Sequence, residues 1–331
     1  MSTILDGLNR KYVARAPHMR EIGLRITAID TARGTMSLPA RPEWVGDPGR
    51  GLLHTGALTV LADSACGLAV GAAMVVMTPY ATLDLRMDWL RPAGPDHEVF
   101  CEAHCYRISR SVAFVRGEVW QADRGQPIAT VQATFMLSTP AGTQRASQLA
   151  NSAGSAASPV AGGADGSAGS TAGVPQAPAP ADGAWQPPAG SVPVLPDNPI
   201  PYIDFLGIRA VPGGDVPLFR LPYQAKLIGN PHLPALHGGV IAGFAETAAL
   251  LHLVQTLGGA KLPKGIDFSI DYLRAGRPVE TFAQCELVRV GARVALVQVR
   301  CWQSAPDKPI VVARGHFLLT APDNAAGTPE N

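Results

Sequence analysis

Two acidic residues stand inside long apolar stretches of this chain, where burying a carboxylate is costly unless it has a partner. Asp63 lies in GLLHTGALTVLADSACGLA, residues 51–69, and Glu246 lies in PALHGGVIAGFAETAALLH, residues 234–252. No lysine or arginine occurs within one helical turn of either acid, so no local ion pair explains their presence. A structural hydrogen bond is one explanation, and an acid with a chemical task is the other.

A histidine–glycine turn precedes each acid. The two turns are His54-Thr55-Gly56 and His237-Gly238-Gly239. If each turn begins a helix, its free backbone N–H groups and partial positive charge suit an oxygen that becomes anionic during a reaction. A plain helix cap is the simpler explanation for one such turn alone. The acid that recurs at the same position in both stretches favours a functional site.

The spacing decides which turn each acid can serve. Thr55 and Asp63 are eight residues apart, which is about 12 Å along a helix. Each acid is therefore too far from the start of its own helix, but antiparallel packing would bring it to the start of the other. This predicts two composite sites, Asp63 with the Gly238 turn and Glu246 with the Thr55 turn. Because Thr55 is β-branched where the other turn has glycine, we expect Asp63 to carry most of the turnover.

The two stretches belong to a tandem repeat. His54 and His237 are 183 positions apart (237 − 54), as are Asp63 and Glu246 (246 − 63). LDLRMDWLR at 83–91 matches IDFSIDYLR at 266–274 with the same offset, which indicates a duplication. Between the halves, residues 141–197 are mostly Ala, Gly, Ser and Pro, with Trp185 as the one aromatic residue. We expect units at 1–140 and 198–331, joined by a flexible linker at 141–197 and packed as an intramolecular pseudo-dimer, with further homo-oligomers left open.

Each half predicts the same order of elements. A strand-like segment such as 34–38 is followed by a loop, one long apolar helix (about 56–77 and 239–257) and about four extended segments. A helix that is apolar all round needs a sheet to cover it, so the expected fold class is α+β with the helix inside the curve of an antiparallel sheet. The first helix is long enough to span a membrane, but Asp63 and its Ala and Gly content favour a buried core helix.

Composition limits the partners. With 47% hydrophobic residues, 16% charged residues and a net charge of +1, the chain has no basic surface for nucleic acid. The N-terminus is too polar for a secretory signal, so a cytoplasmic protein is expected. The five irregularly spaced cysteines predict reduced core thiols rather than a metal site.

The turn followed by its acid, together with ATLDLRMDWLRP, resembles the hotdog-fold thioesterases of the phenylacetate-degradation (PaaI-like) type, over about 20–140 and 200–320. The resemblance implies a double hotdog that hydrolyses acyl-CoA thioesters to a carboxylate and free CoA. We expect this hydrolysis to need no metal and no organic cofactor, because the sequence pairs an acid with a helix start and shows no metal-ligand cluster. It also implies that the acid activates water or attacks the thioester while the amide after the histidine polarises the carbonyl. The catalytic residues would be Asp63, Glu246, Gly238 and Thr55, of which Thr55 departs from the family's glycine.

Further residues are candidates for substrate binding. They are His54, His237, Gly56, Gly239, Arg91 and Arg274. The histidines would orient the turn or contact substrate, and the arginines would meet CoA phosphates or lie in solvent. Four aspartates alternate with apolar residues and mark a solvent or interface face, Asp84, Asp88, Asp267 and Asp271.

Two other functions remain open from the sequence. A hotdog acyl-CoA hydratase or dehydratase would pair an acid with a nearby histidine, but Leu68 and Leu251 stand five residues after the acids. A non-catalytic acyl-CoA-binding or regulatory protein would keep the acids without turnover. Release of free CoA thiol separates an enzyme from a binder, whose melting temperature alone would respond to acyl-CoA.

Overall fold

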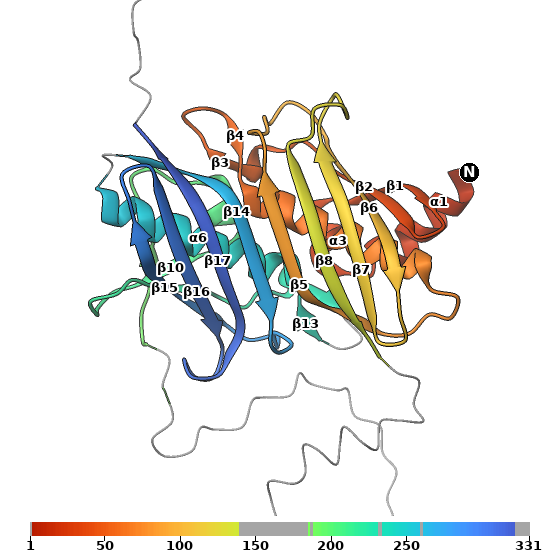
Figure 1. Ribbon diagram of the computed structural model, residues 1–331. Helices are drawn as coiled ribbons and strands as arrows, with labels where there is room; N and C mark the ends of the chain where they lie inside the picture. The colour runs from red at the N-terminus through yellow and green to blue at the C-terminus, as the bar shows by residue number, and fades with distance from the viewer. Residues whose placement is uncertain (1, 139–184, 186–187, 231–233, 259–260, 322–331) are drawn as a thin grey trace, which may run out of the picture.

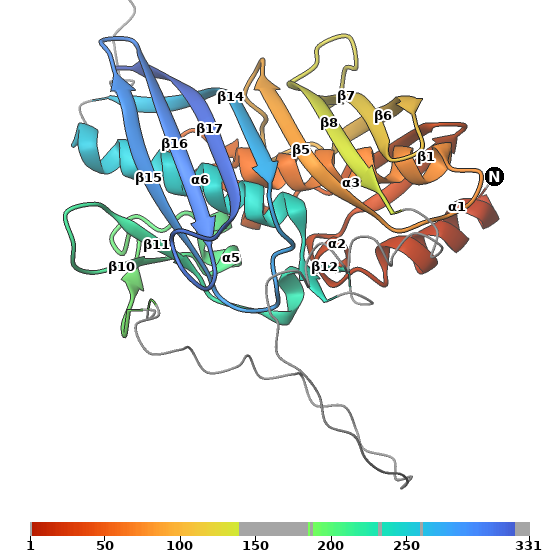
Figure 2. The same cartoon turned by 60° about the horizontal axis from the view of Figure 1, so that its bottom comes forward.

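The computed structural model describes residues 2–138, 185, 188–230, 234–258 and 261–321. Two long helices, α3 (Thr55–Ala73) and α6 (Gly238–Leu257), lie against one face of a continuous curved sheet (Figures 1 and 2). Each repeat therefore has one central helix covered by antiparallel strands. This confirms the expected α+β class and the double hotdog.

The elements of the two repeats follow the same order. The first repeat contains α1 (Ser2–Leu8), a π-helical turn η1 (Asn9–Val13), α2 (Pro17–Ile22), β1 (Arg25–Asp30), β2 (Arg33–Leu38), η2 (Pro42–Trp44), β3 (Val45–Asp47), β4 (Leu52–Leu53), α3, β5 (Tyr80–Trp89), β6 (Val99–Ile108), β7 (Val112–Trp120) and β8 (Ala129–Leu137). The second contains β9 (Val192–Pro193), α5 (Pro201–Leu206), β10 (Arg209–Val211), β11 (Leu218–Leu221), η3 (Ala225–Leu227), β12 (Ile228–Asn230), β13 (Ala235–Leu236), α6, β14 (Leu262–Tyr272), β15 (Thr281–Val290), β16 (Val294–Trp302) and β17 (Pro309–Thr320).

The repeats join at the middle of the sheet. In the described part of the chain, the 13-stranded sheet runs β1-β2-β6-β7-β8-β5-β14-β17-β16-β15-β11-β10-β9. β5 pairs antiparallel with β14, which places Asp84 opposite Asp271 and Asp88 opposite Asp267. One sheet therefore runs through both units, and the repeats form a pseudo-dimer within one chain.

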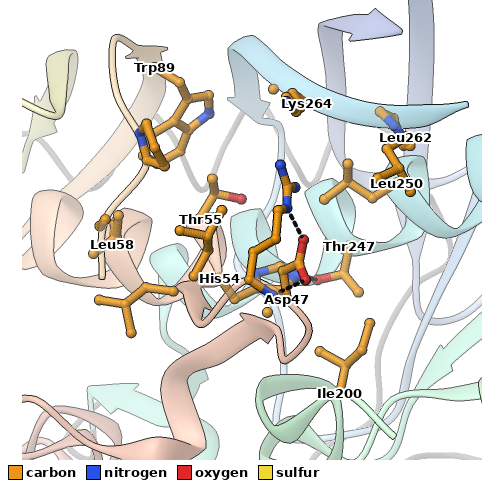
Figure 3. A pocket seen from close by; sticks show the side chains of 18 of the residues that line it. Asp47, His54, Thr55, Leu58, Trp89, Ile200, Thr247, Leu250, Leu262 and Lys264 are labelled. Carbon is orange, nitrogen blue, oxygen red and sulfur yellow. Dashed lines mark hydrogen bonds and ion pairs between the residues drawn. The ribbon is translucent and has the colours of Figure 1, made fainter. Parts of the chain in front are cut away.

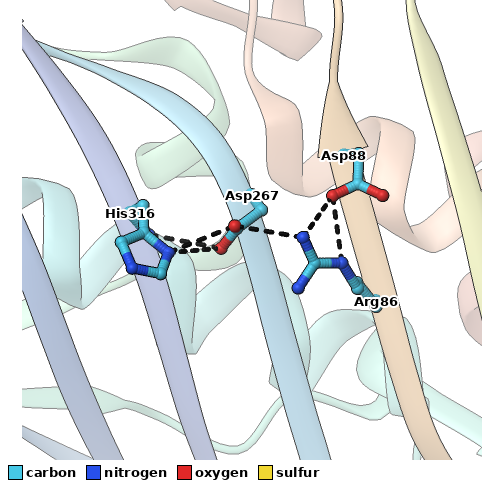
Figure 4. Close-up of polar contacts among 4 residues, drawn as sticks. All are labelled: Arg86, Asp88, Asp267 and His316. Atoms are coloured by element: carbon cyan, nitrogen blue, oxygen red, sulfur yellow. Dashed lines mark hydrogen bonds and ion pairs between the residues drawn. The ribbon is translucent and has the colours of Figure 1, made fainter.

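The line where β5 pairs with β14 is called the seam below. Its four aspartates lie on the outer face of the sheet. Leu85 and Met87 are buried toward the helices, so the alternating residues of β5 point the other way. Arg86 donates to Asp88 on its own strand and, at 3.1 Å, to Asp267 across the seam (Figure 4). The aspartates thus mark an interface face, as expected, and lie on the far side of the sheet from the two helix acids.

The central helices pack very closely. A Cβ added at Gly239 would lie 2.6 Å from the Cα of Val60, and one at Gly56 would lie 3.0 Å from the Cα of Gly243. These contacts place the first turn of each helix against the second turn of the other, so the helices are antiparallel. Both helices are apolar enough to span a membrane by length and composition, but 83% and 72% of these segments are buried within the fold.

Helix α3 is shorter than expected. It ends at Ala73 rather than near residue 77, whereas α6 ends at Leu257 as expected, with Gly258 in the left-handed region at φ 57°. Val75, Val76 and Met77 are exposed, so no buried face supports a further turn there. Two of these three residues are β-branched, which also disfavours a helix.

The expected linker at 141–197 lies mostly outside the described residues. Its described end packs on the second repeat: the Trp185 ring lies 4.9 Å from Phe282 and 5.9 Å from Trp302, centroid to centroid. β9, at residues 192–193, pairs with β10 at the edge of the sheet. The second unit therefore begins before residue 198.

The five cysteines are free and buried in the core. Burial raises the pKa of the Cys101 and Cys285 thiols, so these groups stay protonated at neutral pH. The expectation of reduced core thiols agrees with this arrangement.

Candidate active site

Two places bring an acid of one long helix to the first turn of the other. We call them the Asp63 site, formed by Asp63 and the turn at 237–239, and the Glu246 site, formed by Glu246 and the turn at 54–56. The antiparallel contact of α3 and α6 creates both of them. The composite arrangement expected from the spacing is therefore present, while the catalytic roles stay predictions.

His237 caps the helix at the Asp63 site. Its Nδ1 accepts the N–H of Gly239 at 3.1 Å, and its Nε2 lies 3.2 Å from the hydroxyl of Ser64. Ser64 donates its own proton to the carbonyl of Val60, so the proton between ring and hydroxyl belongs to Nε2. Burial lowers the pKa of His237, although the nearby carboxylate of Asp63 opposes the shift. The ring is a neutral cap, which agrees with a role in orienting the turn.

His54 has the same arrangement at the Glu246 site. Its Nδ1 accepts the N–H of Gly56 at 3.0 Å, and its Nε2 lies 3.4 Å from the hydroxyl of Thr247. Thr247 donates to the carbonyl of Gly243, and the ring of Tyr202 stacks on His54 at 4.6 Å. Burial lowers the pKa of His54 to about 4, so this ring is also a neutral cap at physiological pH.

Asp63 has protein partners for both carboxylate oxygens. Oδ2 accepts the N–H of Gly239 at 2.8 Å, and Oδ1 accepts the hydroxyl of Thr82 at 3.0 Å. A Cβ at Gly238 would lie 2.9 Å from Oδ2, so only glycine permits this close approach. Tyr272 donates to the carbonyl of Gly238 at 2.9 Å and fixes the same turn. The carboxylate is therefore held firmly at the start of α6.

Glu246 is more deeply buried and lacks such partners. Its side chain is 1% exposed, and neither carboxyl oxygen has a hydrogen-bond partner among the described residues. Burial raises the pKa of Glu246 to about 7. The Thr55 hydroxyl and the Trp89 indole N–H are close enough to lower this pKa, but neither reaches hydrogen-bonding geometry. Near pH 7 the acid is thus divided between its neutral and charged forms.

The backbone donors of the turns differ in availability. The Gly56 and Gly239 N–H groups are taken by the cap histidines. No acceptor within the described residues takes the N–H of Thr55 or of Gly238, each of which begins its helix and is half-buried. These two groups are therefore the donors that remain for a ligand oxygen.

A cavity of about 650 Å³ opens at the Glu246 site (Figure 3). Thr55 and Trp89 form part of its wall, and Leu58, Leu250 and Leu262 add apolar surface from both repeats. A volume of this size lies within the range of roughly 300–1,000 Å³ that is typical of small-molecule sites. The cavity therefore joins an apolar space to the turn and to the residues that face Glu246.

The expected arginines make similar contacts in the two repeats. Arg91 donates to the carbonyl of Pro127, and Arg274 donates to that of Pro309. Arg91 also lines the cavity, together with Lys264. Binding of CoA phosphates by Arg91 or Arg274 stays a prediction. Within the described ranges, no group of three His, Cys, Asp or Glu side chains is placed to hold a metal.

Sequence reasoning missed Thr82 and Trp89, which face the two acids. Their counterparts 183 positions on are Gly265 and Tyr272, so the repeats differ at these points. A repeat is recognised from matching residues, so positions that differ between the repeats, such as Thr82 and Gly265, give no signal. A comparison of unlike pairs next to the two acids would have found them.

Several known proteins resemble this chain. The family model described as "Thioesterase superfamily" matches residues 50–128 and 233–310. The medium/long-chain acyl-CoA thioesterase YigI of Salmonella typhimurium is 27% identical over 139 residues, covering 38% of this chain and 88% of that protein. A mutant of the phenylacetic acid degradation protein PaaI of Thermus thermophilus is 30% identical, covering 36% of this chain and 97% of that one, with a TM-score of 0.33. The acyl-CoA thioesterase II TesB2 of Mycobacterium marinum is 12% identical, covers 92% of this chain and 98% of that one, and has a TM-score of 0.54, a likeness of fold.

Proposed function

This chain belongs to the thioesterase superfamily and is a thioester hydrolase of the double-hotdog type, and we propose that it hydrolyses acyl-CoA thioesters to a carboxylate and free CoA. The observation that carries the proposal is the contact of an acid with the start of a helix from the other repeat, Asp63 Oδ2 at 2.8 Å from the Gly239 N–H. The resemblance to YigI supports acyl-CoA as the substrate class. A cytoplasmic location and the lack of a cofactor remain predictions of the sequence.

The proposed chemistry uses the acid in its charged form. The carboxylate of Asp63 or Glu246 takes a proton from water, or attacks the thioester carbon itself. The carbonyl oxygen becomes an oxyanion and accepts the free N–H of Gly238 or Thr55. On the water route, the resulting hydroxide adds to the thioester carbon, the C–S bond breaks, and the acid gives its proton to the departing CoA thiolate. On the carboxylate route, the C–S bond breaks to leave a mixed anhydride, water cleaves the anhydride, and a proton released by that water goes to the thiolate. Loss of one such donor lowers the rate by about 10²–10³ in comparable sites.

The experiment is a CoA-release assay with acetyl-, octanoyl-, hexadecanoyl- and phenylacetyl-CoA, in the presence and absence of EDTA. We expect thiol release that EDTA does not change and that the double variant Asp63→Asn, Glu246→Gln abolishes without loss of folding. No release with any ester, or full activity of the folded double variant, contradicts the proposal.

One turnover in H₂¹⁸O separates the two forms of the mechanism. Attack by activated water puts the label into the acid product at once. Attack by the enzyme carboxylate forms a mixed anhydride, and water that cleaves it at the carboxyl carbon of Asp63 or Glu246 puts the label first into the enzyme. Label in the enzyme after one turnover therefore identifies attack by the carboxylate.

A further inference from the structure

We propose that the two composite sites have different substrates, the Glu246 site taking long unbranched acyl chains while the space for a chain at the Asp63 site is filled by two tyrosines. This inference rests on the proposed function and names the acyl class of one of its sites. The glycine-rich turn at 237–239 favours Asp63 as the acid with most of the turnover. This inference instead assigns the long-chain reaction to Glu246.

The wall of the cavity at the Glu246 site suits a hydrocarbon chain. Leu250 and Val254 lie one and two turns beyond Glu246 on α6, and Pro263 lies at the start of β14. All three line the cavity, and Figure 3 shows Leu250 and Leu262 across it from Trp89. The chain would thus lie along α6, while Arg91 and Lys264 give the cavity positive charge for the phosphates of CoA.

The corresponding positions of the first repeat have the opposite character. Offset by 183, Gly67 replaces Leu250, Gly71 replaces Val254, and Tyr80 replaces Pro263. The Tyr80 hydroxyl donates to the carbonyl of Gly67 at 2.8 Å and lies 3.2 Å from the hydroxyl of Tyr12. A Cβ at Gly67 would lie 3.3 Å from the Tyr12 oxygen, and one at Gly71 would lie 3.3 Å from the Tyr80 oxygen. The two rings therefore occupy the space that the glycines leave beside α3.

The hydrogen bonding of the two acids also distinguishes the sites. Asp63 uses both oxygens in bonds to Gly239 and Thr82, whereas both oxygens of Glu246 are buried without a partner. Gly265, the counterpart of Thr82, lines the cavity. A Cβ added at Gly265 would lie 3.7 Å from Glu246 Oε1. Glu246 thus lies directly behind the part of the cavity wall formed by Gly265, Trp89 and Thr55, with both carboxyl oxygens free to accept a hydrogen bond.

The experiment compares kcat/KM for butanoyl-, octanoyl-, dodecanoyl- and hexadecanoyl-CoA. For the unaltered protein we expect a rise of up to about fourfold per methylene until the cavity is full. Leu250→Trp and, as a second variant, Val254→Trp should lower the dodecanoyl value by about tenfold or more and the butanoyl value far less, because they fill the cavity. The matched control Tyr12→Leu at the closed site should leave the dodecanoyl value within about twofold. Glu246→Gln should remove dodecanoyl turnover, and Asp63→Asn should retain it.

Binding of a non-hydrolysable dodecanoyl-CoA thioether separates this inference from the proposed function. If no ester is hydrolysed but Leu250→Trp weakens thioether binding, the proposed function is wrong and the acyl site is correct. If esters are hydrolysed without dependence on chain length, or folded Leu250→Trp and Val254→Trp keep the dodecanoyl rate, the acyl site is wrong. Greater loss of dodecanoyl turnover in Asp63→Asn than in Glu246→Gln also overturns the inference.

Discussion

Replacing Glu246 by glutamine should stabilise the protein at alkaline pH but not at acidic pH. Burial raises the pKa of this carboxyl from 4.5 to about 7, so the folded state binds its proton more tightly than the unfolded state does. The loss of folding stability that comes from ionising the buried Glu246 is absent below about pH 4.5. It grows as the pH rises toward about 7 and is complete above that pH. At about 1.4 kcal/mol per pKa unit, the shift corresponds to about 3 kcal/mol of lost stability. Glutamine has no charge and escapes this loss.

The measurement is urea-induced unfolding of both proteins at pH 5 and pH 8, followed by circular dichroism. The free energy of Glu246→Gln minus that of the unaltered protein should rise by about 2–3 kcal/mol between these pH values. Any cost of burying the amide is the same at both pH values and cancels. Asp63→Asn is the control: an amide NH₂ replaces one carboxylate oxygen, so the variant either loses the bond to the Gly239 N–H, which then keeps only His237 Nδ1, or leaves the Thr82 hydroxyl without its acceptor. It should therefore lose about 1–3 kcal/mol at pH 8. A Glu246→Gln difference that does not change with pH would refute the reasoning.

Three further results are expected. The kcat for dodecanoyl-CoA should rise with pH around an apparent pKa of about 7, since Glu246 acts when charged, and a flat profile from pH 5 to 9 would exclude this. Gly239→Ala should lower the free energy of unfolding by about 1–3 kcal/mol or more, because its Cβ meets the α3 backbone, while Gly7→Ala in α1, with open space around it, should be neutral or stabilising in the same assay. Arg86→Ala should cost less than about 1 kcal/mol, because the Arg86 side chain is 40% exposed and Asp267 keeps His316 as a partner; a much larger loss in thermal melts would show that the outer face holds the repeats together.

The fold could be predicted from the sequence because its signals are local and occur twice. The spacing of His54 and Asp63, and the apolar stretch around them, fixed the helix, its first turn and the need for a partner helix. The end of α3 could not be predicted, because Val75 and Val76 are apolar in sequence but exposed in the fold.

The site was predictable in its acids and turns but not in its surroundings. Thr82 and Trp89 lie on β5, and their closeness to Asp63 and Glu246 depends on how far each strand curves around its helix. Tyr12 comes from the N-terminal segment, about fifty residues before Asp63, and only the packing of η1 brings it to α3. Such distances are set by tertiary packing and leave no periodic signal in the chain.

The joining of both repeats in one chain removes a restriction that identical subunits share. In a symmetric dimer every substitution appears twice, so a tyrosine that closed one pocket would close the other as well. Here Gly67 and Leu250 are encoded by separate codons of one gene, so a substitution in one repeat leaves the other repeat unaltered. The stoichiometry of inhibition should record this history: a long-chain substrate analogue should titrate the protein at one molecule per chain, although two acids and two helix starts are present.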